Sequence, residues 1–279
     1  MRTLAIASLK GGVGKTTLMC ALTIGLARRL PKNGRRRLLA IDCDPQGNAS
    51  LSLLNGESPA DPTLRHVLLA QAPIKAAVRP SRYPGVDMIP ADTSLAECTV
   101  LLSESIGRET RLRSALEGLG NAYDVCLIDS PPGLSLVSMN AMTCANELLV
   151  PIDCSVYAAA GLARLTETVE QIRRYMSHPL QIIGLCLMKV QRSKVCRDFE
   201  RQLRHHYDGL VYKTTVPYAA VVEEACSRNL TVGEYAPASK AAVAFDRLVK
   251  ELTDGQRFGS AKRNPGTHRG AARGKRRAG

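Results

Sequence analysis

Short apolar runs alternate with longer amphipathic segments along most of this 279-residue chain. Short runs rich in Val, Ile and Leu predict buried strands, and we expect these near residues 3–8, 38–41, 74–79, 85–90, 125–128, 147–152, 182–188 and 210–217. Apolar residues three and four positions apart predict helices, at about 18–27, 63–70, 93–103, 108–119, 157–176, 193–207, 219–228 and 238–253. This alternation predicts an α/β fold with a doubly wound, mostly parallel sheet.

The periodic pattern stops near residue 254, which predicts a single domain at 1–254 and a tail at 255–279. The tail holds eight of the 38 Lys and Arg residues and none of the 25 Asp and Glu residues. It has no apolar periodicity, so we expect it to be disordered. A basic tail of this kind binds polyanions without sequence preference, although it could also be an inert solubilising extension. It lacks Leu, Ile and Val, which argues against a membrane-binding amphipathic helix.

The sequence Lys-Gly-Gly-Val-Gly-Lys-Thr-Thr at positions 10–17 lies between the first predicted strand and the first predicted helix. A strand, a glycine loop ending in Gly-Lys-Thr and a helix form the arrangement of a phosphate-binding loop. The glycines let backbone N–H groups turn toward a phosphate, and the helix N-terminus adds partial positive charge. We expect Lys15 to contact the β- and γ-phosphates and the Thr16 hydroxyl to bind Mg²⁺. The residues predicted to hold the nucleotide are Lys10, Gly11, Gly12, Val13, Gly14, Lys15, Thr16 and Thr17.

Three aspartates follow predicted strands. Asp42 and Asp44 come directly after the apolar run at 38–41, and Asp129 ends the run at 125–128 before Ser-Pro-Pro-Gly. The carboxyl ends of parallel strands hold the ligand in doubly wound folds. Carboxylates there bind Mg²⁺ through its waters or orient a hydrolytic water. Asp129 therefore has the position of a Walker B aspartate, and the alternative for Asp42 is a turn-capping role.

These stretches together resemble the ParA/Soj branch of the ParA/MinD family of P-loop ATPases. Leu9 stands where the general loop pattern has Gly, and Lys10 stands at the early "signature" lysine of this family. The segments 106–116 and 138–142 carry the same resemblance, which covers about residues 2–253 and weakens after 185. The segment after the last predicted strand departs from the family's pattern, and Pro217 is the position there that we still expect near adenine.

The resemblance implies an ATPase that uses ATP and Mg²⁺ and hydrolyses slowly until a partner stimulates it. Lys10 would reach across an ATP-bound homodimer to the partner's nucleotide, so Lys10, Lys15 and Asp44 are the predicted catalytic residues. Asp44 would position the attacking water. The predicted metal-site residues are Thr16, Asp42 and Asp129.

The implied function is DNA partition in the cytoplasm, in association with the nucleoid and without a membrane. The dimer would bind DNA nonspecifically, and hydrolysis stimulated by a ParB-like adaptor would release it. Basic residues along one predicted helix and in the tail are the candidate DNA contacts, although a solvated helix face would have the same pattern. They are Arg192, Lys194, Arg197, Arg201, Arg204, Arg273, Lys275, Arg276 and Arg277.

Two other functions are compatible with the loop. One is an ATPase of the same family that positions a protein complex rather than DNA. The other is a metabolic or redox enzyme, either a ligase with a second-substrate pocket or a reductase with two cysteines poised to bridge a cluster. The nine cysteines are odd in number and contain no C-x-x-C. Most lie in apolar runs, as Cys126 does, and this predicts buried, reduced thiols.

Overall fold

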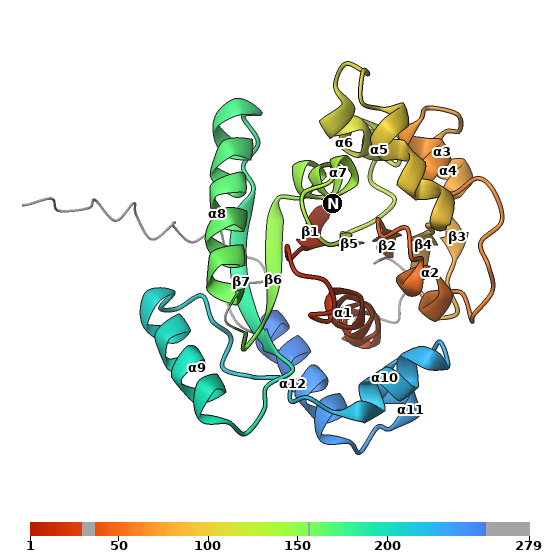
Figure 1. Cartoon of the computed structure of the whole chain (residues 1–279). Helices are drawn as coiled ribbons and strands as arrows, with labels where there is room; N and C mark the ends of the chain where they lie inside the picture. The colour runs from red at the N-terminus through yellow and green to blue at the C-terminus, as the bar shows by residue number, and fades with distance from the viewer. Residues whose placement is uncertain (30–36, 156, 255–279) are drawn as a thin grey trace, which may run out of the picture.

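A seven-stranded sheet with helices on both faces forms the protein, of which the computed structural model describes residues 1–29, 37–155 and 157–254 (Figure 1). The strand order is β3-β4-β2-β5-β1-β6-β7. All neighbouring strands are parallel except β3 and β4, so the predicted doubly wound α/β fold is confirmed. The strands are β1 (Arg2–Ile6), β2 (Leu38–Asp42), β3 (Arg79–Pro80), β4 (Val86–Ile89), β5 (Val125–Asp129), β6 (Glu147–Asp153) and β7 (Gln181–Met188).

Helices connect the strands, and capping hydroxyls set some of their ends. The Ser193 hydroxyl accepts the Cys196 N–H at the start of α9, and Ser135 does the same for Ser138 in α7. The helices are α1 (Lys15–Arg29), α2 (Asn48–Leu53), α3 (Leu64–Leu68), α4 (Ile74–Ala77), α5 (Cys98–Leu101), α6 (Arg111–Glu117), α7 (Leu136–Cys144), α8 (Ala158–Tyr175), α9 (Lys194–His206), α10 (Ala220–Ser227), α11 (Val232–Tyr235) and α12 (Lys240–Asp254). Two 3₁₀ turns, η1 (Thr93–Glu97) and η2 (Arg108–Thr110), precede α5 and α6.

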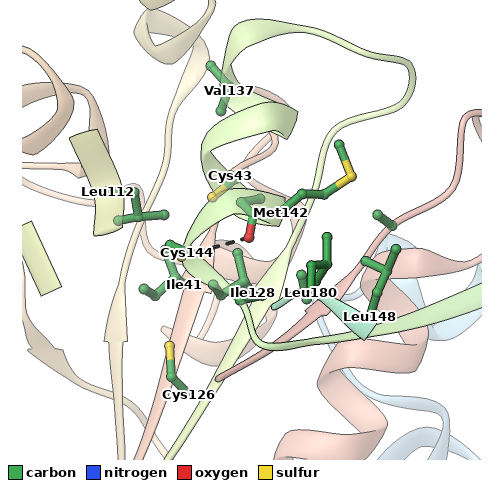
Figure 2. Close-up of a cluster of buried hydrophobic side chains, with 14 of the residues drawn as sticks. Ile41, Cys43, Leu112, Cys126, Ile128, Val137, Met142, Cys144, Leu148 and Leu180 are labelled. Atoms are coloured by element: carbon green, nitrogen blue, oxygen red, sulfur yellow. Dashed lines mark hydrogen bonds between the residues drawn. The ribbon is translucent and has the colours of Figure 1, made fainter. Parts of the chain in front are cut away.

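Successive side chains of each strand point to opposite faces of the sheet and pack into two separate hydrophobic cores. On β1, Leu4 packs in the core that α1 and α12 cover, while Ala5 packs in the core on the opposite face. Figure 2 shows part of the second core, where Cys126 of β5 and Cys144 of α7 lie among aliphatic side chains. Because both faces are covered, the strands are apolar nearly throughout.

The strand predicted at 74–79 is wrong. Residues Ile74–Ala77 form α4, which begins directly after Pro73, and β3 covers only Arg79–Pro80. Ile74 and Ala77 are both buried and three residues apart, which is also helical spacing. A short apolar run does not distinguish a buried strand from a short buried helix.

The strand predicted at 210–217 is also wrong. This segment makes two isolated parallel bridges beside β7, between Leu185 and Val211 and between Val190 and Pro217. The backbone N–H groups of the intervening residues 213 and 214 instead donate to the Glu251 carboxylate of α12, at 2.6 and 2.9 Å. The Glu251 side chain therefore replaces the backbone ladder at residues 213 and 214, although backbone hydrogen bonds on either side still join the segment to β7.

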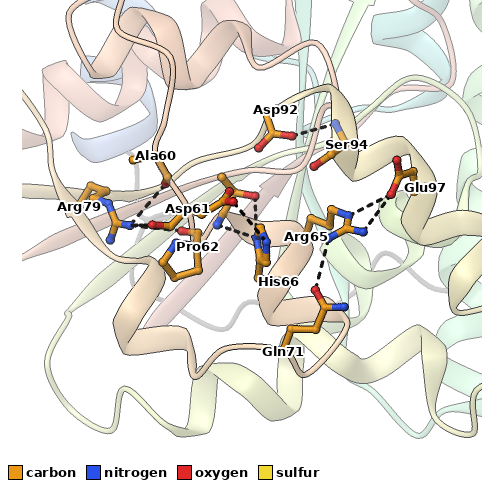
Figure 3. A network of polar contacts seen from close by, with 11 residues as sticks. Ala60, Asp61, Pro62, Arg65, His66, Gln71, Arg79, Asp92, Ser94 and Glu97 are labelled. Atoms are coloured by element: carbon orange, nitrogen blue, oxygen red, sulfur yellow. Dashed lines mark hydrogen bonds and ion pairs between the residues drawn. The ribbon is translucent and has the colours of Figure 1, made fainter.

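A polar network braces the segment between α2 and α5 (Figure 3). The Arg65 guanidinium bonds Glu97 and Gln71, which ties α3 to η1. Arg79 donates to the backbone carbonyls of residues 60–62. Within this segment, the Ala91 N–H donates to the Ser50 hydroxyl of α2 at 2.9 Å. The network therefore supports the region around β2 on which the candidate site depends.

The last described element, α12, ends at Asp254. The predicted tail at 255–279 lies outside the described residues, and so do the four candidate DNA contacts within it, Arg273, Lys275, Arg276 and Arg277. None of the described helices is long and apolar enough to cross a bilayer.

Candidate functional site

The candidate site lies where β1, β2 and β5 end side by side. β1 leads into the glycine loop, and the register pairs both Ile6 and Asp42 with Asp129. The sheet changes winding direction at β1, because β2 and β5 lie on one side of it and β6 on the other. Such a switch point leaves a crevice beyond the strand ends. A cavity of about 890 Å³ opens here.

The glycine loop has a backbone conformation that requires glycine. Gly12 and Gly14 have φ angles of +71° and +96°, which residues with a Cβ rarely adopt. Val13 is buried and is not among the described residues that line the cavity, so a contact with a nucleotide would use its backbone. The loop residues that do line the cavity are Gly11, Gly12, Gly14, Lys15, Thr16 and Thr17.

Lys15 is a buried cation at the mouth of this loop. Its side chain is 6% exposed, and its Nζ donates a long 3.4 Å hydrogen bond to the Lys10 carbonyl. Burial lowers the pKa of Lys15, and the charges of Asp129 and Asp44 partly oppose that shift. An anion in the cavity would therefore stabilise the protonated lysine.

Thr16 and Asp129 form a pair that matches a magnesium site. The Thr16 Oγ1 donates to the Asp129 Oδ2 at 2.6 Å, while the buried Asp129 Oδ1 has no hydrogen-bond partner among the described residues. Burial, and next the charge of Asp42, raise the pKa of Asp129 well above its ordinary value. A buried carboxylate with an unpaired oxygen is costly. A cation beside it would offset that cost.

Asp42 anchors the segment that follows β2. Its Oδ1 accepts the Asp44 N–H at 3.0 Å, and its Oδ2 accepts the Ser50 N–H and hydroxyl at 2.9 and 2.8 Å. Burial raises the pKa of Asp42 to about 6, against the lowering effect of these hydrogen bonds. The predicted place of Asp42 around Mg²⁺ stays a prediction. The anchoring of Ser50 was not evident from the sequence.

Asp44 lies on one wall of the cavity, and the Pro-Pro-Gly turn after β5 lies on another. The Asp44 Oδ1 accepts the Gln46 N–H at 3.0 Å. Pro132 lines the cavity with Asp44, and the Gly133 N–H donates to the Leu9 carbonyl at 3.1 Å. Both turns therefore contact the glycine loop or the cavity, where they could respond to a terminal phosphate.

ATP and Mg²⁺ fit these groups. Among the described residues no three His, Cys, Asp or Glu side chains gather as a metal cage. Mg²⁺ does not need such a cage, because it keeps several waters and binds through one or two protein oxygens plus substrate phosphates. Thr16 and the unpaired Asp129 oxygen would supply the protein oxygens, and the loop N–H groups and Lys15 would hold the phosphates.

Lys10 lies apart from this cavity. Its Nζ pairs with the Asp153 carboxylate at the end of β6, its side chain is 46% exposed, and it is not among the described lining residues of the large cavity. Asp153 was missed by the sequence analysis. The signal was present, because it is an acidic residue at the end of an apolar run, as Asp42 and Asp129 are.

The far end of the cavity is built from the C-terminal third of the chain. Pro217 lines it, as expected of an adenine-proximal residue, and its role stays a prediction. Distant elements add lining residues that no local pattern marks, because α1, α10 and α12 meet only in the folded chain. Examples are Ile24, Arg28, Tyr218, Cys226, Phe245 and Val249.

The predicted basic face of α9 is largely exposed. Arg192, Lys194, Arg197 and Arg201 are exposed, and Arg201 lies 3.7 Å from Asp198. Arg204 differs, because its guanidinium bonds Glu200 and the backbone carbonyls of residues 212 and 213. The first four side chains are therefore exposed and Arg204 is engaged within the chain, and the role of all five as DNA contacts stays a prediction.

Comparison with known proteins gives matches over most of the chain. The family described as an AAA domain matches residues 1–182. The chromosome partitioning protein ParA of Caulobacter vibrioides is 37% identical over 94% of this chain and 97% of its own length. The chromosome-partitioning ATPase Soj of Thermus thermophilus is 36% identical over 90% of this chain and 95% of its own. This chain belongs to the ParA/Soj family of partition ATPases.

The resemblance seen in the glycine loop is thereby confirmed, and this ParA/Soj-family member is an ATPase whose cofactors are ATP and Mg²⁺. A solved structure of similar fold is the cobyrinic acid a,c-diamide synthase of Mycobacterium smegmatis with bound ADP and magnesium. It has a TM-score of 0.77 and 28% identity, over 94% of this chain and 96% of that one.

Proposed function

We propose that this ATPase partitions DNA by cycling between a monomer and an ATP-bound homodimer. The dimer binds DNA nonspecifically in the cytoplasm, at the nucleoid, and hydrolysis stimulated by a ParB-like adaptor releases it. The cargo is a plasmid, a chromosome or an integrated element. The names of the two partition relatives, both similar over nearly their whole length, support this assignment.

The observation that carries the dimer is the placement of the two loop lysines. Lys15 is buried in the cavity of its own chain. Lys10, five residues earlier, is half exposed and pairs with Asp153 outside that cavity. A lysine held at the surface beside a nucleotide site is available to a second subunit. This geometry supports a site that is completed across a dimer, with Lys10 exchanging Asp153 for the partner's phosphates.

Within each site the residues have separate proposed roles. Lys15 binds the β- and γ-phosphates, and Thr16 and Asp129 hold Mg²⁺, which neutralises charge on the phosphates when bound. Asp44 orients the attacking water, and Asp42 fixes the backbone that carries Asp44. The exposed residues of α9 contact DNA phosphates.

DNA binding measured with ATP, with ADP and without nucleotide tests the proposal. We expect binding of duplexes of unrelated sequence with ATP alone, and a steep salt dependence, because phosphate contacts release counterions. Lys15→Ala is the matched control that should abolish the ATP effect. Equal DNA binding under all three conditions, or none with ATP, would overturn the partition cycle.

The metabolic alternative has two observations in its favour. The cavity runs past the glycine loop to α10 and α12, and a similar solved structure is named as a diamide synthase. Such an enzyme would bind nucleotide without acquiring affinity for DNA.

An ATPase that positions a protein complex would instead bind DNA with ATP but respond to an adaptor other than a ParB-like protein. The same DNA assay distinguishes the metabolic enzyme from the partition ATPase. An ATPase assay with an added ParB-like adaptor distinguishes the ATPase that positions a protein complex.

A further inference from the structure

Two cysteines meet where the loop after β6 contacts the first turn of α9. Cys154 follows β6 directly, and Cys196 is the third residue of α9. The Cys154 Sγ lies 4.0 Å from the Cys196 carbonyl oxygen, although the residues are 42 positions apart. Folding therefore brings the two cysteines into contact, which a disulfide between them requires.

The environment of Cys196 favours its thiolate. The Ser193 hydroxyl accepts the Cys196 N–H at 3.1 Å and caps a helix of 13 residues. Burial raises the pKa of the Cys196 thiol, but hydrogen bonds with Ser193, the Gln191 backbone and Cys154 outweigh it, and the net shift is downward. A thiol near a helix N-terminus is a better nucleophile at neutral pH because more of it is ionised.

The pKa of the Cys154 thiol is shifted in the opposite direction from that of Cys196. It is half-buried, and burial followed by its hydrogen bond to Cys196 raises its pKa to about 12. It therefore stays protonated beside the Cys196 sulfur. The cysteines of the core differ from Cys196 in the direction of the pKa shift, since burial raises the pKa of Cys43, Cys126 and Cys144.

We propose that Cys154 and Cys196 are a peroxide-responsive thiol pair that closes to an intramolecular disulfide between the β6 loop and α9. The Cys196 thiolate attacks one oxygen of hydrogen peroxide, which breaks the O–O bond, forms a sulfenic acid and releases hydroxide. Cys154 then attacks the sulfenic sulfur, loses its proton and displaces a second hydroxide. The two thiols lose two electrons, and with the released protons the peroxide becomes two waters.

The disulfide would join two functional surfaces. Asp153, which holds Lys10, is bonded to Cys154 in sequence, while Lys194 and Arg197 flank Cys196 on α9. Oxidation fixes the loop that keeps Lys10 on its own chain, and it fixes the helix that faces DNA. We expect ATP-dependent DNA binding to fall severalfold on oxidation. This consequence rests on the proposed function, whereas disulfide formation does not.

Peptide mapping of the unaltered full chain tests the disulfide. The reduced protein is treated with a small excess of hydrogen peroxide, alkylated under denaturing conditions and digested for mass spectrometry. We expect a linked pair of peptides containing Cys154 and Cys196, a fall from nine alkylated thiols to seven, and full reversal by a dithiol reductant. Cys226→Ser is the matched control, because this exposed cysteine could form disulfides between chains. The linked pair should persist in it.

Two mapping results would overturn the proposal. One is oxidation of Cys226 while Cys154 and Cys196 both remain alkylated. The other is over-oxidation of Cys196 to a sulfinic acid with Cys154 still free. DNA binding is then compared for oxidised and reduced protein, with Cys154→Ser as the variant that should not respond to peroxide. If the disulfide forms and no DNA binding occurs in either state, the proposed function fails and the thiol pair stands.

Discussion

The buried carboxylate of Asp129 is unfavourable in the nucleotide-free protein, and a bound cation would stabilise it. It is fully buried, Thr16 satisfies one of its oxygens, and the other is unpaired among the described residues. Beside it Asp42 is buried as well and already uses both oxygens to hold Asp44 and Ser50. Two neighbouring buried carboxylates disfavour their charged forms. At the scale of single residues, these buried carboxylates therefore lower the stability of the nucleotide-free protein, and a bound metal ion and phosphates would offset that cost.

Asp129→Asn should stabilise the nucleotide-free protein at neutral pH. A carboxyl whose pKa is raised on folding stabilises the folded state below its unfolded pKa, and that contribution is lost as pH rises toward the folded pKa. The unfolding free energy of the unaltered protein should therefore fall from about pH 4 upward. The fall should be smaller in Asp129→Asn, because the buried amide has no carboxyl proton to lose. Urea unfolding at several pH values measures this.

The exposed Asp208 provides the control for that experiment. Asp208→Asn should follow the pH profile of the unaltered protein. If the unfolding free energy falls equally with pH in all three proteins, folding does not raise the pKa of Asp129.

Asp44→Ala should bind ATP normally but hydrolyse it about 10²–10⁴-fold more slowly, the range expected for loss of a group that handles the attacking water. Asp44 lines the cavity and is not needed to hold the glycine loop. Single-turnover hydrolysis separates the chemical step from binding. Glu57→Ala, at an exposed carboxylate of the loop after α2, should behave as the unaltered protein. Normal turnover by Asp44→Ala would remove Asp44 from the reaction.

At the scale of elements, the packing of α1 on α12 positions one side of the cavity. A Cβ added at Gly25 of α1 would lie 2.6 Å from Val249 Cγ1 of α12, so glycine lets the two helices approach. In α8 no described atom lies within 4 Å of a Cβ added at Gly161. The same substitution should thus have opposite effects in the two helices.

Gly25→Ala should destabilise the protein by about 1–3 kcal/mol through overpacking. Gly161→Ala should stabilise it by about 0.5–1 kcal/mol, because alanine is the better helix residue. Urea midpoints at constant m-value measure both. Adding Val249→Ala to Gly25→Ala should recover part of the loss. A neutral Gly25→Ala would mean that α1 and α12 are packed less closely than described.

The basic face of α9 predicts a specific salt dependence. Lys194→Gln combined with Arg197→Gln should lower the slope of log affinity against log salt by about 1.8, since each lost phosphate contact contributes roughly 0.9. The charge-matched control is Lys75→Gln with Arg113→Gln. These exposed residues lie on α4 and α6, away from α9 (Figure 1). If both double variants lower the slope equally, α9 has no special role.

At the scale of the whole molecule, the proposed dimer predicts that Lys10 acts on the partner's nucleotide, because Lys10 pairs with Asp153 and is not among the described residues that line its own cavity. Lys10→Ala should bind ATP as a monomer with little change in affinity, and should fail to form the ATP dimer. Light scattering of the protein with and without ATP gives the mass. Lys75→Ala, at an exposed lysine, should dimerise normally. A Lys10→Ala dimer with ordinary turnover would leave each site complete in one chain.

Much of this architecture was predictable because it is encoded locally. Strands buried on both faces are apolar throughout, and a phosphate loop needs its glycines, lysine and threonine within a few residues. The errors fell where contacts between distant segments override the local pattern. The Glu251 carboxylate takes the N–H groups of residues 213 and 214 that a last strand would have used, and no nearby residue signals this.

The sequence alone determined the fold class, the phosphate loop and the aspartates at the strand ends, because periodicity and motif spacing act over short stretches of chain. The tertiary structure decided which oxygens of those aspartates are free, where Lys10 is held, and which residues of α10 and α12 close the cavity. It also brought Cys154 to Cys196. Each of these depends on packing between segments tens to hundreds of residues apart, and such distances are fixed only when the sheet is assembled.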